Sequence, residues 1–157
     1  MDIYLDTTII LARSRSLDYS ITLLLMICDW SIGDLPGLNN AEEALLQGLG
    51  ITTTGQLLLF APDAATKQQL ALNLGTKIQY VNKLVALADL ARLPGIGCQY
   101  NGLLLHTGII SVKQLAQMPA HKSHQQILKL HVATLQRRDL CPDLAQVQNW
   151  IRQAQGL

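Results

Sequence analysis

The segment Gly95-Ile96-Gly97 has the residue types best suited to hold an anion. It follows Leu93-Pro94 and stands directly before a predicted helix, whose first amides have no partner within the helix. Two glycines let the backbone approach a ligand closely, and free amides at a positive helix end favour a phosphate or a carboxylate. We expect Ile96 to insert into the core and hold the turn rigid. Such a turn suits a nucleic-acid backbone that is bound without base contacts.

Basic side chains near this turn would add phosphate contacts, and they are Arg92, Lys113, Lys122, Arg137 and Arg138. The net charge of +1 hides an asymmetry: residues 1–91 carry five Lys or Arg against nine Asp or Glu, whereas residues 92–157 carry seven against two. A polyanion should therefore prefer the second part of the chain, with an affinity that falls steeply with salt. The alternative is a solvated surface around a purely structural turn.

Other side chains with possible chemistry form weaker patterns. His121, His124 and His131 have helical spacing, but no carboxylate or cysteine accompanies them, so we interpret them as surface or capping histidines and expect no metal. Cys98 stands at the start of a predicted helix, a position that can lower the pKa of a thiol. The alternative is a buried or merely tolerated cysteine, because the sequence positions no base to act with it.

The sequence lacks a P-loop, a Rossmann glycine fingerprint, a zinc pair and a nucleophile elbow. We expect a protein that is not an enzyme and needs no cofactor.

An internal duplication supplies the elements that would position these residues. The segment that starts at Leu35 aligns without gaps with the segment that starts at Leu93, through Leu-Pro-Gly, a Leu-Leu pair, Gly-Ile and Gln-Leu. Each copy predicts one helix, over about 39–49 and about 98–107. Gly50 and Gly108 are expected to end these helices in the left-handed conformation, as in a Schellman motif. The duplication predicts two helix-hairpin-helix units.

Each predicted unit continues beyond its first helix in the same way. The capping-box patterns Thr53-x-x-Gln56 and Ser111-x-x-Gln114 start a further short helix. Each unit then ends in an equivalent amphipathic helix, with apolar residues at the same spacing in both: Val81, Leu84 and Val85 in the first, Val147, Trp150 and Ile151 in the second. The second unit is longer around Leu128 to Leu140, where we expect a longer helix before Cys141-Pro142.

The two copies differ in their turns. The first one, Gly37-Leu38-Asn39, lacks the second glycine, and Glu42 and Glu43 follow it. Asparagine tolerates the left-handed region, so the turn can form, but its side chain would obstruct a phosphate. We therefore interpret the first hairpin as structural and assign the predicted anion site to the second.

Composition favours helices, because Leu, Ala and Gln are frequent and aromatic residues make up 4% of the chain. We predict an all-α fold of tandem helix-hairpin-helix repeats packed as one compact domain, with a SAM-domain-like or paired helix-hairpin-helix architecture. We expect residues 1–30 to form an arm or appended helix, residues 31–91 the first repeat and residues 92–157 the second.

The three cysteines lie far apart in the sequence, which favours a cytoplasmic location. No apolar run is long enough to insert into a membrane.

Three segments carry a family resemblance: LALNLGTKIQYVNKLV, ADLARLPGIGCQYNGLLLHTGIISVKQLAQMP and CPDLAQVQNWIRQA. Together they resemble a family of domains of unknown function with tandem helix-hairpin-helix motifs, abundant in cyanobacteria, over about residues 31–157. The resemblance implies a fold similar to the paired helix-hairpin-helix domains of DNA repair and recombination proteins, and a nucleic-acid role. Asn39, in place of glycine, and Leu84, where a Trp like Trp150 is expected, depart from the pattern.

Two functions remain open on the sequence. The first is a non-enzymatic, non-sequence-specific binder of a nucleic-acid backbone, DNA or RNA, through the second hairpin. The alternative is a protein-interaction adaptor that displays an apolar surface from Ile21 to Trp30 or from the longer helix after Lys122. The modest net charge and the acidic first part favour the adaptor.

Overall fold

The fold is known from a computed structural model that describes residues 28–135 and 141–157. All regular elements in these ranges are helices, and a single antiparallel bridge joins Ser31 and Thr53. The predicted arm at residues 1–27 lies outside the described residues. In the described part, no helix is both long and apolar enough to cross a bilayer.

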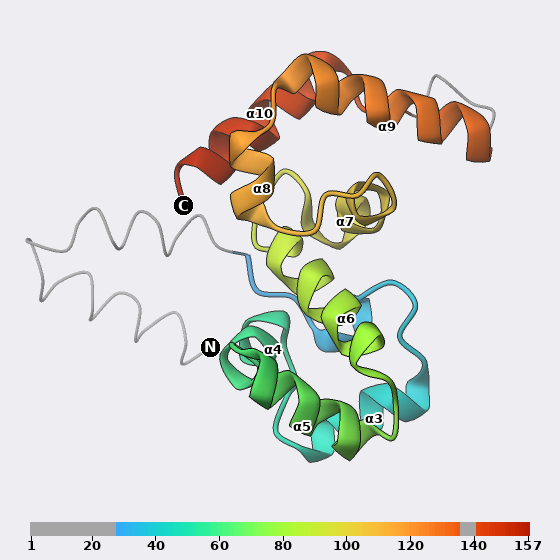
Figure 1. Cartoon of the computed structure of the whole chain (residues 1–157), viewed down its shortest axis with the longest axis vertical. Helices are drawn as coiled ribbons and strands as arrows, with labels where there is room; N and C mark the ends of the chain where they lie inside the picture. The colour runs from blue at the N-terminus through green and yellow to red at the C-terminus, as the bar shows by residue number, and fades with distance from the viewer. Residues whose placement is uncertain (1–27, 136–140) are drawn as a thin grey trace, which may run out of the picture.

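In the part of the chain that the structure describes, eight α-helices follow a short 3-10 helix, η2 (Ile32–Asp34). The first four, which with η2 we call the first unit, are α3 (Asn40–Gly48), α4 (Thr54–Phe60), α5 (Ala64–Leu74) and α6 (Ile78–Ala91). The next four, which we call the second unit, are α7 (Gly97–His106), α8 (Val112–Gln117), α9 (Ala120–Leu135) and α10 (Leu144–Gln155). Figure 1 shows α3 to α5 at one end of the molecule, α8 to α10 at the other, and α6 between them.

The first helix of each unit ends as the sequence predicts. Gly50 has φ +85° and Gly108 has φ +92°. The amide of Ile51 donates to the carbonyl of Leu46 at 2.9 Å, and the amide of Ile109 donates to the carbonyl of Leu104 at 3.0 Å. These are the long bonds of two Schellman motifs, and they bury Ile51 and Ile109 in the core.

The second helix of each unit begins with a variant of the predicted capping box. The hydroxyl oxygens of Thr53 and Ser111 accept from the amides of Gln56 and Gln114, as expected. The glutamine side chains, however, reach one residue beyond the N-cap: Gln56 Oε1 accepts from the amide of Thr52 at 2.7 Å, and Gln114 Oε1 from the amide of Ile110 at 2.9 Å. The same departure in both units supports the internal duplication.

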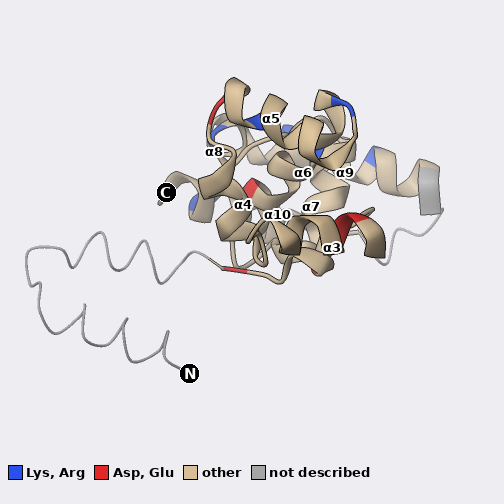
Figure 2. Ribbon diagram, turned by 90° about the horizontal axis from the view of Figure 1, so that it is seen from below, with Lys and Arg blue, Asp and Glu red and all other residues tan. Residues whose placement is uncertain are grey.

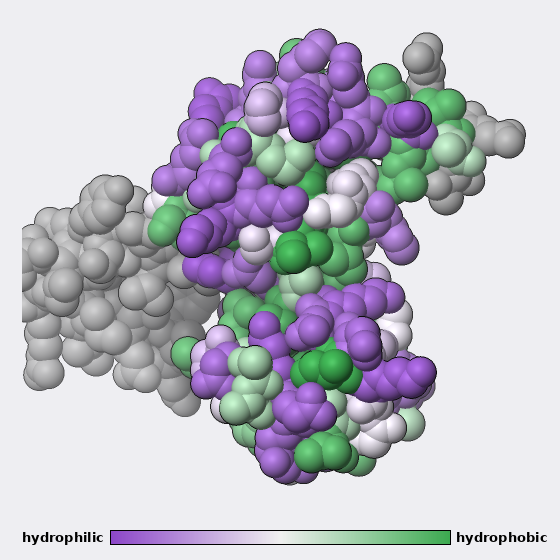
Figure 3. Space-filling model, in the orientation of Figure 1, coloured by the Kyte–Doolittle hydropathy of each residue, from purple (hydrophilic) through white to green (hydrophobic). Residues whose placement is uncertain are grey.

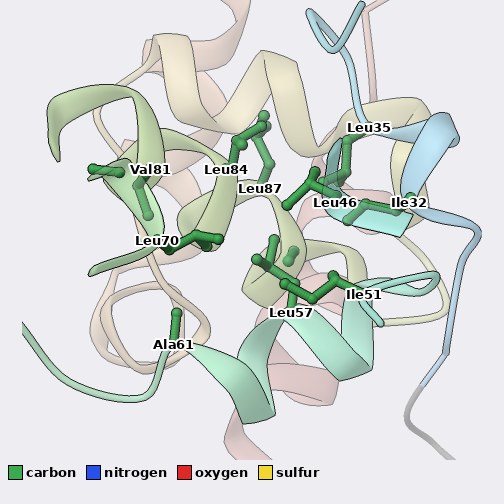
Figure 4. Packing of buried hydrophobic residues seen from close by; sticks show 12 residues of the cluster. Ile32, Leu35, Leu46, Ile51, Leu57, Ala61, Leu70, Val81, Leu84 and Leu87 are labelled. Atoms are coloured by element: carbon green, nitrogen blue, oxygen red, sulfur yellow. The ribbon is translucent and has the colours of Figure 1, made fainter. Parts of the chain in front are cut away.

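Two apolar clusters form the interior, one in each unit. Figure 4 shows the first, in which Leu84 and Leu87 of α6 lie close to Leu35 and Leu46. The second cluster includes Leu90, at the end of α6, together with Trp150 of α10. Helix α6 therefore contributes to both cores and joins the two units. The expected longer helix of the second unit is α9, which spans 16 residues against 11 in α5.

Candidate functional site

The backbone amides of the Gly95–Gly97 turn all donate within the chain. The amide of Gly95 donates to Gln153 Oε1 at 3.0 Å, and the amides of Ile96 and Gly97 donate to the carbonyl of Leu93 at 3.1 and 3.0 Å. The prediction of free amides at this turn is therefore wrong. The expectation that Ile96 inserts into the core is confirmed, because this side chain is buried in the second cluster.

Trp150 of α10 packs directly on Gly95. Its indole Nε1 donates to the carbonyl of Gly95 at 2.8 Å. A Cβ atom at position 95 would lie 2.7 Å from Trp150 Cδ1, which is shorter than a tolerable contact. Gly95 is therefore required by the close approach of an indole ring, which occupies the space that a side chain would need.

Trp30 covers Gly97 in a similar way. Gly97 has φ +51°, and a Cβ atom there would lie 2.7 Å from Trp30 Cζ2. The indole Nε1 of Trp30 donates to the carbonyl of Ala91 at 2.9 Å, and the Trp30 backbone is tied to α4 by a hydrogen bond from the amide of Thr54 at 2.8 Å. Trp30 was predicted to belong to an exposed apolar surface, but it packs against the second hairpin turn; residues 21–27 of that surface lie outside the described residues.

The first hairpin turn has a different backbone conformation. Here the left-handed residue is Gly37, with φ +84°, whereas the second turn has it at Gly97. Asn39, for which we expected tolerance of the left-handed region, is extended, with φ −91°, and caps α3 in a reciprocal capping box with Glu42. The hydroxyl of Tyr80 also donates to the Glu42 carboxylate. The two turns are equivalent in sequence position but not in shape.

The basic residues of the predicted site differ in their surroundings. Arg92 Nη1 lies 2.8 Å from Asp89 Oδ1, and Asp89 Oδ2 accepts from the amide of Val112 at 2.8 Å. Arg92 thus belongs to a link between α6 and the start of α8. Lys113 on α8 and Lys122 on α9 are exposed. Arg137 and Arg138 lie outside the described residues.

The histidines form no metal cluster within the described part of the chain, where no three His, Cys, Asp or Glu side chains are grouped to hold an ion. His121 is exposed and His124 half-buried. His131 was interpreted as a surface or capping residue, but it is only 7% exposed, and neither of its ring nitrogens has a hydrogen-bond partner among the described residues. Its position on the inner side of α9 explains the difference.

Burial and the nearby Asp34 carboxylate raise the pKa of the Cys98 thiol to about 11. This direction is opposite to the lowered pKa that a helix N-terminus would produce, and it favours the interpretation of Cys98 as a tolerated, half-buried cysteine. Burial also raises the pKa of Cys28 and Cys141, and all three cysteines are free thiols.

A cleft of about 760 Å³ lies between the two units, at a place that no sequence pattern indicated. We call it the inter-unit cleft. Its apolar lining comes from both units: Leu58, Ala61, Val85, Ala86, Leu105 and Ile110. Its polar lining includes Lys67, Gln79, Asn82, Lys83, Asp89 and Ser111. In Figure 3, hydrophobic residues cross the middle of the molecule between the more hydrophilic surfaces of the two ends.

Helix α6 supplies one long side of the inter-unit cleft. Gln79, Asn82, Ala86 and Asp89 line it at helical spacing, so they form one stripe on the helix. Ile110, from the connection between α7 and α8, also lines the cleft and is 58% exposed. No local sequence pattern marks the cleft, because its sides come from segments that are far apart in the chain.

Within residues 28–135 and 141–157 the regular elements are all helical, and the helix ends at Gly50 and Gly108 have matching hydrogen bonds. A family model described as a domain of unknown function (DUF4332) matches residues 36–157, and the chain belongs to that family. No curated protein and no solved structure matches the chain.

Proposed function

We propose that this protein is a non-enzymatic protein-interaction adaptor that binds a segment of a partner in the inter-unit cleft. The observation that carries this proposal is the cleft itself, which has an apolar floor, a polar rim and the exposed side chain of Ile110. Apolar concave surfaces with a few polar groups at their edge are the usual sites of recognition. The hairpin turn offers no comparable opening, because Trp30 and Trp150 cover its glycines.

A pull-down from cells with the full-length chain as bait tests the proposal. Ile110→Asp places a charge in the cleft at an exposed position, and Leu72→Asp, at a position on α5 that is 67% exposed and outside the cleft lining, is the matched control. We expect partners that survive nuclease treatment, are lost with Ile110→Asp and are kept with Leu72→Asp. Equal capture by both variants would count against the cleft as the binding surface.

Nucleic-acid binding through the second hairpin is the second candidate, and the net positive charge of residues 92–157 favours it. Its contacts would have to come from side chains such as Lys113 and Lys122, since the amides of the turn are engaged. Fluorescence anisotropy with a 20-base-pair duplex at several salt concentrations tests it. Salt-sensitive binding that is lost in a Lys113→Glu, Lys122→Glu double variant would replace the adaptor proposal with this one.

We further infer that the two units are tandem helix-hairpin-helix motifs and that the protein works in the cytoplasm. The matching Schellman ends and the matching side-chain caps of Thr53 and Ser111 support the first inference. Three free cysteines support the second, because a reducing compartment preserves thiols. For the fold, we expect an experimental structure in which residues 40–61 superpose on residues 98–119, after the turns that differ in shape.

A further inference from the structure

We propose that the occupant of the inter-unit cleft is an acidic, amphipathic helical segment of the partner. This inference rests on the proposed function and adds the chemistry of the ligand. It depends on three features of the cleft: the charges at its rim, the apolar residues of its floor and its length along α6.

Lysine side chains dominate the charge at the rim. Lys67 and Lys83 line the inter-unit cleft, and Lys83 also lines an adjoining hollow with Lys77. These lysines belong to the part of the chain with a net negative charge, so a count along the sequence does not reveal them. In Figure 2 basic positions lie near α5 and acidic positions on α3, and one acidic position also lies on the α5 side of the molecule.

The carboxylates near these lysines are already engaged. Asp89, the acidic residue among those that line the cleft, binds Arg92 and the amide of Val112, each at 2.8 Å. Asp63, which caps α5, accepts from the amide of Thr66 at 2.8 Å. Neither carboxylate forms a salt bridge with Lys67 or Lys83 within the described residues. Hydrogen bonds from Thr66 and, less strongly, the charge of Lys67 lower the pKa of Asp63. The lysine ammonium groups therefore remain open to Glu or Asp of a ligand, to which they are complementary.

The apolar floor favours a peptide over a nucleic acid. Leu58, Val85 and Leu105, all partly buried, supply aliphatic surface from α4, α6 and α7. Aliphatic side chains bury apolar anchors of a peptide, but they gain nothing from a phosphate backbone and provide no stacking platform for bases. The combination of an aliphatic floor and a lysine rim fits a ligand that is apolar on one side and acidic on the other.

The length of the cleft fits a short helix. The α6 stripe runs from Gln79 to Asp89, which at 1.5 Å per residue is about 15 Å. A partner helix of roughly ten residues has the same length and presents anchors at positions i, i+3 or i+4, and i+7. We therefore expect two or three apolar anchors, flanked by acidic residues that face Lys67 and Lys83.

Selection from a random 12-residue peptide display library, with the full-length chain as bait, tests this proposal. We expect enriched peptides to be acidic and amphipathic, and their affinity to fall at least tenfold in a Lys67→Glu, Lys83→Glu double variant. A Lys122→Glu, Lys129→Glu variant makes the same change of net charge on exposed positions of α9 and should bind within twofold of the unaltered chain. The cleft variant should in turn bind peptides in which Lys replaces Glu.

The outcomes separate the two proposals. Peptides that require Ile110 but are neutral or basic would overturn the acidic ligand and leave the adaptor function standing. The absence of any enriched peptide that depends on Ile110 would overturn both. A photo-crosslinking residue at position 110 identifies other occupants: crosslinks to residues 1–27 of the same chain, to a second copy or to a DNA duplex, in place of the selected peptide, would contradict the proposal.

Discussion

Gly95 and Gly97 each face the ring of a tryptophan at a separation that leaves no room for a methyl group. The Trp150 indole also donates to the carbonyl of Gly95, and the Trp30 indole to the carbonyl of Ala91. Two glycines around an apolar residue therefore serve here to bring two indole rings onto the backbone. The same residue pattern is compatible with an anion site and with tight packing, and only the partners across space distinguish them.

Substitution of these glycines should destabilise the protein. We expect Gly95→Ala and Gly97→Ala each to lower the free energy of unfolding by about 1–3 kcal/mol, because the added methyl group must displace an indole ring. The loss should be larger at Gly97, whose φ of +51° also disfavours alanine. Urea denaturation measures both.

Gly48→Ala is the matched control for these variants. Gly48 ends α3, and a Cβ atom there would meet nothing within 4 Å. We expect it to be neutral or to stabilise the protein by up to about 1 kcal/mol, since alanine is the better helix former. Losses of equal size at all three positions would contradict the role of the two indole rings.

The raised pKa of Cys98 predicts slow alkylation. A thiol with a pKa of about 11 in place of 9.0 has roughly one hundredth of the usual thiolate fraction near neutral pH, and the thiolate is the reacting species. The rate with iodoacetamide should therefore keep rising as the pH increases through 9 toward 11. Mass spectrometry of the modified peptide measures the rate, and a plateau below pH 9 would show that the helix N-terminus lowers the pKa after all.

At the scale of elements, Asp89 connects α6 with α8. One carboxylate oxygen binds Arg92 and the other accepts from the amide of Val112, which begins α8. We expect Asp89→Ala to lower the free energy of unfolding by about 1–3 kcal/mol, because it leaves the guanidinium and an amide at the helix start without this acceptor.

Arg92→Ala is the comparison for Asp89→Ala. It removes a partly exposed ion pair, with side chains 29% and 21% exposed, but leaves the carboxylate on the amide of Val112. Arg92→Ala should lower the free energy of unfolding by about 0–1 kcal/mol. If the two variants are equally destabilised, the bond to α8 contributes nothing measurable.

The helices of this protein are predictable from sequence to a large extent because their ends depend on neighbouring residues. The Schellman bonds at Gly50 and Gly108 and the hydroxyl caps at Thr53 and Ser111 all join residues within five positions of each other. The hairpin turn depends instead on Gln153, 58 residues from Gly95, and on Trp30. The inter-unit cleft likewise needs segments from both units, so its existence could not be read from a local pattern.

At the scale of the whole molecule, α6 belongs to both cores and Trp30 joins the start of the first unit to the turn of the second. We therefore expect the two units to unfold in one cooperative transition. Far-ultraviolet circular dichroism reports on all helices, and tryptophan fluorescence reports on Trp30, between the two units, and on Trp150, in the second core. The two urea curves should coincide; separate midpoints would show that each unit unfolds independently.

The central claim is that ligand recognition takes place in the inter-unit cleft and not at the second hairpin turn. Mapping of backbone amide chemical shifts by nuclear magnetic resonance, during titration of the full-length chain with a selected peptide, tests it most directly. We expect the largest changes at cleft residues such as Val85, Ala86 and Ile110. Changes concentrated at Gly95 to Gly97, with Lys113 and Lys122, would contradict it.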